Sequence, residues 1–268
     1  MIFYSPFEFS YLWLPLIGFV VGLLASGIGA GGGLFYLIFL VLFFRVSPQV
    51  AVSTSLAATL PISIVGSIGH FRYGHIHLKL AGIFAVGGVL GAWVGASLTN
   101  FMTPQILKMS FGIYAVLLAG YLLLNAKNKG KKNSGTPGTG LMLTSTKAVK
   151  GSVFGLLSGI ISGGFGTGGA APVLAGLLVL RLPVKLVVGT SLLVVLVNSI
   201  AGMAAHFVVG KIDLTMVLFL CSGAIIGAIA GPKVLAGIDT SNAEGPVRKW
   251  YAVGLIVIGL VMIVTSNF

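Results

Sequence analysis

The sequence predicts an all-α membrane protein, a polytopic transmembrane helical bundle built from two inverted repeats. Three observations indicate this class. First, 57% of the 268 residues are hydrophobic and only 7% are charged, whereas soluble domains carry about 25% charged residues. Second, apolar runs long enough to cross a bilayer recur from Tyr11 to the C-terminus. Third, the chain matches itself when it is displaced by 136 residues, which indicates a duplication.

The internal match is specific. Between residues 50 and 95, 17 of 46 positions are identical to those found 136 residues later, and they include a Thr-Ser pair and a His-Phe pair. A shared membrane composition would instead produce scattered Leu and Gly matches. The first repeat therefore covers residues 1–124 and the second covers residues 149–268. Between them, the polar and basic residues 125–148 are expected to form a linker outside the bilayer.

Each repeat contains about five hydrophobic segments. The segments of the first repeat are residues 11–27, 34–44, 50–71, 79–98 and 104–124, and those of the second are residues 149–162, 171–181, 187–209, 214–231 and 249–265. The second segment of each repeat would rise only about 16 Å as a helix, whereas the hydrocarbon core is about 30 Å thick. The first two segments of each repeat are therefore expected to form a broken or re-entrant pair. Whether the second segment crosses or re-enters is left open.

Loop charges indicate the orientation. The net charge is +12, which is typical of Lys-rich cytoplasmic loops and does not require a nucleic-acid partner. If the repeats are inverted, 13 Lys and Arg residues fall on one side of the membrane and 3 on the other, whereas parallel repeats give 9 and 7. The positive-inside rule therefore favours inversion, with a cytoplasmic linker and both termini outside the cytoplasm.

Two glycine clusters interrupt the apolar segments at matching positions. In inverted membrane repeats, interrupted helices mark a substrate site near the midplane. Backbone N–H groups, and the N-termini of helices beginning near Leu34 and Ala171, would face an anion there. Close helix packing through small residues is the alternative interpretation. The residues predicted to bind the substrate are Gly29, Gly31, Gly32, Gly33, Gly166, Thr167, Gly168 and Gly169.

Polar side chains at membrane depth are few. All four acidic residues fall in predicted loops or termini, which argues for an anionic or neutral substrate. The polar residues at membrane depth are Thr54, Ser55, Thr59, Ser63, Thr190, Ser191, Asn198 and Ser199. Of these, the repeated pairs Thr54-Ser55 and Thr190-Ser191 are predicted to help bind the substrate. Hydrogen bonding to helix carbonyls is the alternative for each hydroxyl.

Further residues are candidates for proton coupling or gating. His70 and His206 end equivalent segments, Arg45 and Arg181 end the two short segments, and Asn198 lies within a long segment. Histidine titrates near neutral pH, and the arginines could attract anions to a cavity mouth. An interfacial structural role is the alternative for both kinds of residue. The second repeat does not keep the histidines that follow His70, so no metal or other cofactor is expected.

The ordered motifs resemble a known family. The glycine breaks "SGIGAGGGLF" and "SGGFGTGGAAP" are each followed by "TSL" and then by "GHFRYGHI" or "AHFVVGKI". This pattern resembles the TauE/SafE sulfite exporter family over residues 11–265. The resemblance implies movement of sulfur-containing anions such as sulfite, thiosulfate, sulfoacetate or other sulfonates. It does not imply individual binding residues, and the candidates above come from the repeat.

The expected function is secondary transport, in the export direction, of small sulfur-containing anions by alternating access around the two breaks. A passive anion channel is the nearest alternative. A membrane-embedded enzyme is disfavoured because no nucleophile beside a base is apparent at depth. The glycine runs also lack the Gly-Lys-Ser/Thr ending of an ATP-binding loop. The expected location is the cell membrane, with membrane lipids and a small anion as partners, and the oligomeric state is left open.

Overall fold

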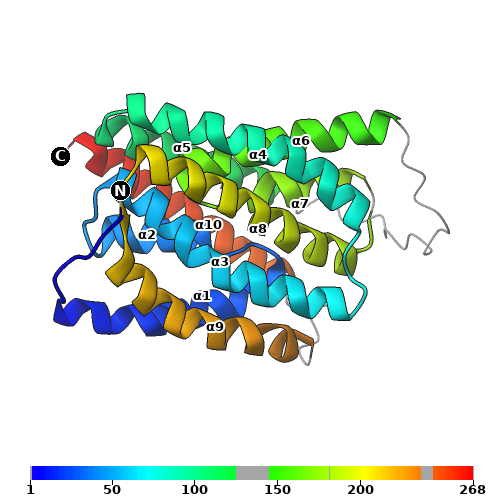
Figure 1. Ribbon diagram of the computed structural model, residues 1–268, viewed down its shortest axis with the longest axis horizontal. Helices are drawn as coiled ribbons and strands as arrows, with labels where there is room; N and C mark the ends of the chain where they lie inside the picture. Colours follow the sequence, from blue (N-terminus) through cyan, green and yellow to red (C-terminus); the bar gives the residue numbers. More distant parts are fainter. Residues whose placement is uncertain (1, 125–144, 181, 237–243, 268) are drawn as a thin grey trace.

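The computed structural model describes residues 2–124, 145–180, 182–236 and 244–267. Within them the chain forms a bundle of long helices lying side by side (Figure 1). The first-half helices are α1 (Leu14–Ile28), α2 (Gly33–Leu42), α3 (Pro48–Arg72), α4 (Leu78–Phe101) and α5 (Pro104–Leu124). The second-half helices are α6 (Ser145–Phe165), α7 (Ala170–Val179), α8 (Val184–Val209), α9 (Leu214–Ala236) and α10 (Glu244–Val264). An all-α membrane bundle, as the sequence predicts, is confirmed.

Three long helices of each half have the length and composition of membrane spans. Among the described residues, six helices qualify, and they belong to α1, α3 and α4 and to their counterparts α6, α8 and α9. The ten-residue helices α2 and α7 are apolar but shorter, as the sequence predicts. The protein is therefore a multi-pass membrane protein with two interrupted segments at matching positions.

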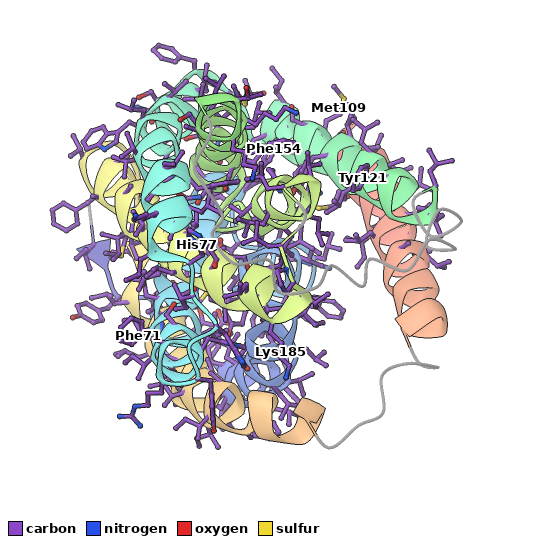
Figure 2. All side chains as sticks on the ribbon, turned by 90° about the vertical axis from the view of Figure 1, so that its right-hand side faces the viewer. Phe71, His77, Met109, Tyr121, Phe154 and Lys185 are labelled. Carbon is purple, nitrogen blue, oxygen red and sulfur yellow. The ribbon has the colours of Figure 1, made fainter. Side chains whose placement is uncertain are left out.

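The helices of the two halves are interleaved. Helix α1 packs on α9, and its counterpart α6 packs on α4. Helix α3 packs on α8, and α5 packs on α10. Figure 2 shows α5, which carries Met109 and Tyr121, standing with α10 to one side of the other helices. Exchanging the two halves converts each of these helix pairs into another pair of the same set, so neither half packs as a separate domain.

Rows of glycine explain how closely the outer pairs approach. A Cβ atom built on Gly87 of α4 would lie 2.5 Å from the Ser152 carbonyl of α6, and Gly91 and Gly95 contact the same helix. The matching row on α9, Gly223 and its repeats, meets the backbone of α1. These rows are packing surfaces, as expected for small residues between membrane helices.

Two predicted boundaries differ from the structure. Helix α6 begins at Ser145, inside the predicted linker, of which residues 125–144 lie outside the described residues. It also continues to Phe165, beyond the predicted end at residue 162. The continuation has a physical cause, because Gly163 is a helical contact point against the backbone of Ala92 on α4 rather than part of the break.

Short elements close one end of the bundle. The strand β1 (Ile2–Phe3) pairs in parallel with β2 (Ile212–Asp213). The 3-10 helices η1 (Phe9–Trp13) and η2 (Thr265–Asn267) flank α1 and α10. Helix α10 ends at the end of the bundle where α1 begins, whereas α6 begins at the opposite end (Figure 1).

Candidate functional site

The two glycine breaks have the same backbone conformation. Positive φ angles of 83°, 68° and 87° occur at Gly29, Gly31 and Gly32. The second break repeats them, at 69°, 70° and 69°, at Gly166, Gly168 and Gly169. This left-handed region is unfavourable for residues with a Cβ atom. The glycines therefore end α1 and α6 and redirect the chain into α2 and α7, as predicted.

The breaks lie against each other. A Cβ atom built on Gly33 would lie 2.9 Å from the carbonyl carbon of Thr167 and would also contact the Gly166 carbonyl oxygen. Residues from both long central helices join this contact. The Cγ2 methyl of Thr59 on α3 and the Cγ1 methyl of Val195 on α8 both adjoin Gly31 and Gly168. The sequence predicts this meeting of the breaks.

Two hydroxyls beside the breaks have no hydrogen-bond partner among the described residues. Ser63 lies beside Gly31, and Ser199, its counterpart 136 residues later, lies beside Gly168. Their Oγ atoms would be 3.5 and 3.2 Å from Cβ atoms built on those glycines. Both serines are fully buried, and both Oγ atoms are unpartnered. Buried polar atoms are normally hydrogen-bonded, so two equivalent exceptions at one place indicate a place for a ligand or water.

The short helices α2 and α7 begin at this point without side-chain caps. The N-cap residues are Gly32 and Gly169, and neither helix has a side-chain hydrogen bond at its N-cap. The first N–H groups of a helix have no partner inside that helix and carry partial positive charge. The Gly169 N–H does find the Thr167 hydroxyl, at 3.3 Å. The remaining N–H groups of the two first turns suit an anion.

The Thr-Ser pairs hold backbone of the opposite half. Ser55 Oγ donates to the Gly166 carbonyl at 2.9 Å, and Ser191 Oγ lies 3.0 Å from the Gly29 carbonyl. The threonines accept instead of donating. Thr54 accepts from the Asp213 N–H at 3.2 Å, and Thr190 accepts from the His77 N–H at 3.0 Å. These four hydroxyls position the two breaks, and their direct contact with a substrate stays a prediction.

One polar connection exists in the second half alone. Ser158 Oγ donates to the Gly169 carbonyl at 2.7 Å, and Asn198 Nδ2 donates to Ser158 Oγ at 2.7 Å. The equivalent glycine of the first half, Gly32, adjoins the apolar side chains of Val21 and Ile62. The two breaks therefore have different surroundings. Asn198 thus has a positioning contact in the structure, and its predicted part in coupling or gating is not tested.

The two histidines end equivalent helices, as predicted, but are held differently. His206 is buried, and its Nε2 lies 2.7 Å from the Gly163 carbonyl, three residues before the second break. Because a carbonyl can only accept, Nε2 is the protonated nitrogen. His70 is half-buried and faces the Ser26 backbone, yet neither ring nitrogen has a partner within hydrogen-bond geometry.

The predicted arginines do not reach the breaks where they can be assessed. Arg45 is exposed and follows α2 with a positive φ of 52°. Arg181 lies outside the described residues. In the part of the chain that the structure describes, no three His, Cys, Asp or Glu side chains are placed to hold a metal ion.

Two residues of the central contact were not predicted from the sequence. Val195 is apolar and Ser158 lies in the helix before the break, so neither stood out as a polar residue at the aligned positions. The signal for Val195 was its alignment with Thr59, which was already among the polar candidates. Ser158 had no such signal, because its first-half counterpart is Val21.

The sequence was compared with known proteins. It matches the family described as "Sulfite exporter TauE/SafE" over residues 14–262. A "Probable membrane transporter protein YdhB" of Bacillus subtilis is 31% identical over 81% of this chain and 87% of its own length. A second B. subtilis protein, "Probable membrane transporter protein YunE", is 28% identical over 97% and 99%. "Probable membrane transporter protein MJ0441" of Methanocaldococcus jannaschii is 28% identical over 87% and 90%. The chain therefore belongs to the TauE/SafE family of membrane transporters.

Proposed function

We propose that this protein is a secondary transporter that exports small sulfur-containing anions, such as sulfite, thiosulfate or organosulfonates. The observation that carries the proposal is the junction of the two glycine breaks, where Ser63 and Ser199 keep buried hydroxyls without partners. A hydroxyl can donate to an oxyanion without adding a fixed charge, which allows release as well as capture. The sulfur chemistry comes from the family description.

The anion would be held mainly by backbone donors. The uncapped N-termini of α2 and α7 start at Gly32 and Gly169, so they supply N–H groups and partial positive charge at the junction. Neither serine hydroxyl carries charge, and the acidic residue nearest in the fold, Asp213, has its carboxylate bonded to backbone N–H groups. An anion at the junction would therefore meet donors and no opposing carboxylate there.

Alternating access would follow from two inverted halves. The exchange of partners between α1–α9 and α6–α4 supports a two-fold relation between them. The opposite ends at which α1 and α6 begin support inversion (Figure 1). Rocking of one half against the other would then expose the junction to each side in turn. The excess of Lys and Arg predicted on the linker side places that side in the cytoplasm.

A passive anion channel is the second candidate, because a polar junction at depth could also conduct. The two functions differ in kinetics. A transporter shows saturable flux and counterflow, whereas a channel conducts down the gradient without exchange. A membrane-embedded enzyme would need a nucleophile beside a base, and Ser63 and Ser199 have no hydrogen-bonded histidine or carboxylate in the described structure.

The test uses purified protein in liposomes and radiolabelled sulfite, thiosulfate, taurine and sulfate. We expect saturable uptake and counterflow for at least one sulfur anion. In Ser63→Ala/Ser199→Ala this transport should fall by about tenfold or more, because each lost charge-assisted hydrogen bond costs about 1.5–3 kcal/mol. The matched control is Ser222→Ala, which changes an exposed serine that bonds its own helix. Unchanged transport in the double variant would show that the site is elsewhere.

A further inference from the structure

A pocket of about 300 Å³ opens where α3 begins and where α4 and α8 end. Its lining includes Ser47, Gln49, Thr99, Asn100, His206 and Lys211. These side chains offer hydroxyl, amide, imidazole and ammonium groups. Among the described residues that line it there is no carboxylate. The pocket is thus polar and carries one permanent positive charge, from the exposed Lys211.

The walls of the pocket are fixed by long-range hydrogen bonds. Ser53 Oγ, which is fully buried on α3, bonds the Lys211 carbonyl and so holds the chain that carries the ammonium group. Gln49 Nε2 donates to the Met102 carbonyl at 3.3 Å and holds the end of α4 beside Asn100. Residues far apart in sequence therefore build one concave surface, rather than a loop that happens to fold over.

The floor of the pocket reaches the second glycine break. His206 lines the pocket, and its Nε2 is held by the carbonyl of Gly163. On the other side Val50 lines the pocket, and a Cβ atom built on Gly166 would lie 2.9 Å from the Cα of Val52, two residues further along α3. At a rise of 1.5 Å per residue, the six residues from Gln49 to Ser55 span about 9 Å.

The nearby carboxylate does not compete for the pocket. Asp213 is 3% exposed, and its Oδ1 accepts from the N–H groups of Thr215 at 3.0 Å and Met216 at 3.4 Å. Its charge is therefore held against the first turn of α9. The first turn of α3 adds to the positive potential, because its N-cap Ser47 makes no side-chain capping bond.

We infer that this pocket is a second anion-binding site, a vestibule in which a small oxyanion is held by Lys211, Asn100 and the start of α3 before or after it occupies the junction of the breaks. The inference rests on the proposed function, since it makes the pocket one mouth of the same pathway. A phospholipid phosphate has similar chemistry. We assign the site to a free anion because the pocket extends inward to the fully buried level of His206.

The binding test separates the vestibule from the junction. In lipid-free detergent at low ionic strength, Ser63→Ala/Ser199→Ala should keep a weak site for radiolabelled thiosulfate. Adding Lys211→Glu should remove that residual binding, whereas adding Lys185→Glu should not. Lys185 is an exposed lysine at the start of α8, at the end of the bundle that faces the viewer in Figure 2. Residual binding that is absent, or that survives Lys211→Glu, overturns the inference.

Transport gives an independent readout. In liposomes, Lys211→Gln should raise KM about three- to tenfold and leave the maximal rate nearly unchanged, and the difference should shrink as salt shortens the screening length below about 8 Å. A wild-type KM at low salt overturns the vestibule, while the loss of transport in the serine variant would leave the proposed function standing. If phosphatidylglycerol occupies the site and thiosulfate does not displace it, the site is a lipid site and the inference fails.

Discussion

Ser55, in the first half of the chain, donates a hydrogen bond from Oγ to the carbonyl of Gly166 in the second half, at 2.9 Å. The reverse contact joins Ser191 to Gly29 at 3.0 Å. Each break is therefore held by a serine of the other half. This reciprocity couples the positions of the two breaks, because neither can shift without losing a bond to the opposite long helix.

The first prediction concerns these serines and the stability of the fold. Ser55→Ala and Ser191→Ala should each lower the free energy of unfolding by about 1–3 kcal/mol, because a buried carbonyl loses its partner. Part of that loss is offset where the carbonyl finds another donor. Thermal unfolding in detergent measures the effect.

Ser63→Ala is the matched control for that measurement. Its hydroxyl is equally buried but has no partner, so removing it should leave the melting temperature unchanged or slightly raised. The two classes of serine should therefore separate, with stability lost in one and transport lost in the other. Equal loss of stability in Ser55→Ala and Ser63→Ala would contradict this assignment.

The second prediction concerns the glycines at the junction. Gly31→Ala and Gly168→Ala should each cost about 1–2 kcal/mol from the positive φ angle alone. The new methyl would also lie 2.5 Å or 2.7 Å from the Cγ1 of Val195. Transport should fall below a tenth of the wild-type rate, and anion protection against heating should be lost.

Gly82→Ala on α4 supplies the comparison for these variants. Nothing lies within 4 Å of a Cβ atom built there, and the residue is helical. Alanine is favoured over glycine in a helix by about 1 kcal/mol. This variant should be as stable as the wild type or more so, and fully active. Normal transport in Gly31→Ala would remove the break from the site.

The sequence predicted the larger features and missed the asymmetric ones. The repeat identified the breaks, the Thr-Ser pairs and the histidines, because each of these is present twice at one offset. Ser158 and Val195 were not predicted, since their importance arises from contacts between helices. The ends of α6 were misplaced for a related reason. Gly163 reads as a break in sequence, whereas the packing of α4 makes it a helical contact.

The third prediction concerns the two methyl groups between the breaks. Thr59 Cγ2 and Val195 Cγ1 each contact Gly31 and Gly168. Removing both methyls, in Thr59→Ser/Val195→Ala, should open a leak, seen as downhill anion flux without counterflow. The serine keeps a hydroxyl for the Ser55 carbonyl, which Thr59 bonds at 2.8 Å. Liposome efflux with and without trans anion measures the change.

Val195→Thr is the isosteric control for the leak. It preserves the shape of the side chain, and its hydroxyl can bond the Ser191 carbonyl one turn earlier, as Thr59 bonds Ser55. It should keep counterflow at the wild-type level. A tight protein after loss of both methyls would show that the barrier lies at another level of the bundle.

The last prediction uses the difference between the halves as a designed exchange. Ser158 and Asn198 support Gly169 through hydrogen bonds, whereas Val21 and Ile62 adjoin Gly32 in the same places. Ser158→Val alone should strand the amide of Asn198, and Asn198→Ile alone should leave Ser158 without its donor. Each should cost about 1–3 kcal/mol.

The double variant Ser158→Val/Asn198→Ile should be more stable than the sum of the single changes indicates, because it removes both partners together. Space for the isoleucine is available, since Asn198 faces Gly88, whereas the position equivalent to Gly88, opposite the first half, is the larger Ala224. A double-mutant cycle on melting in detergent gives the interaction energy. Additive losses would mean that the two side chains act on Gly169 separately, and the polar connection would then be no unit.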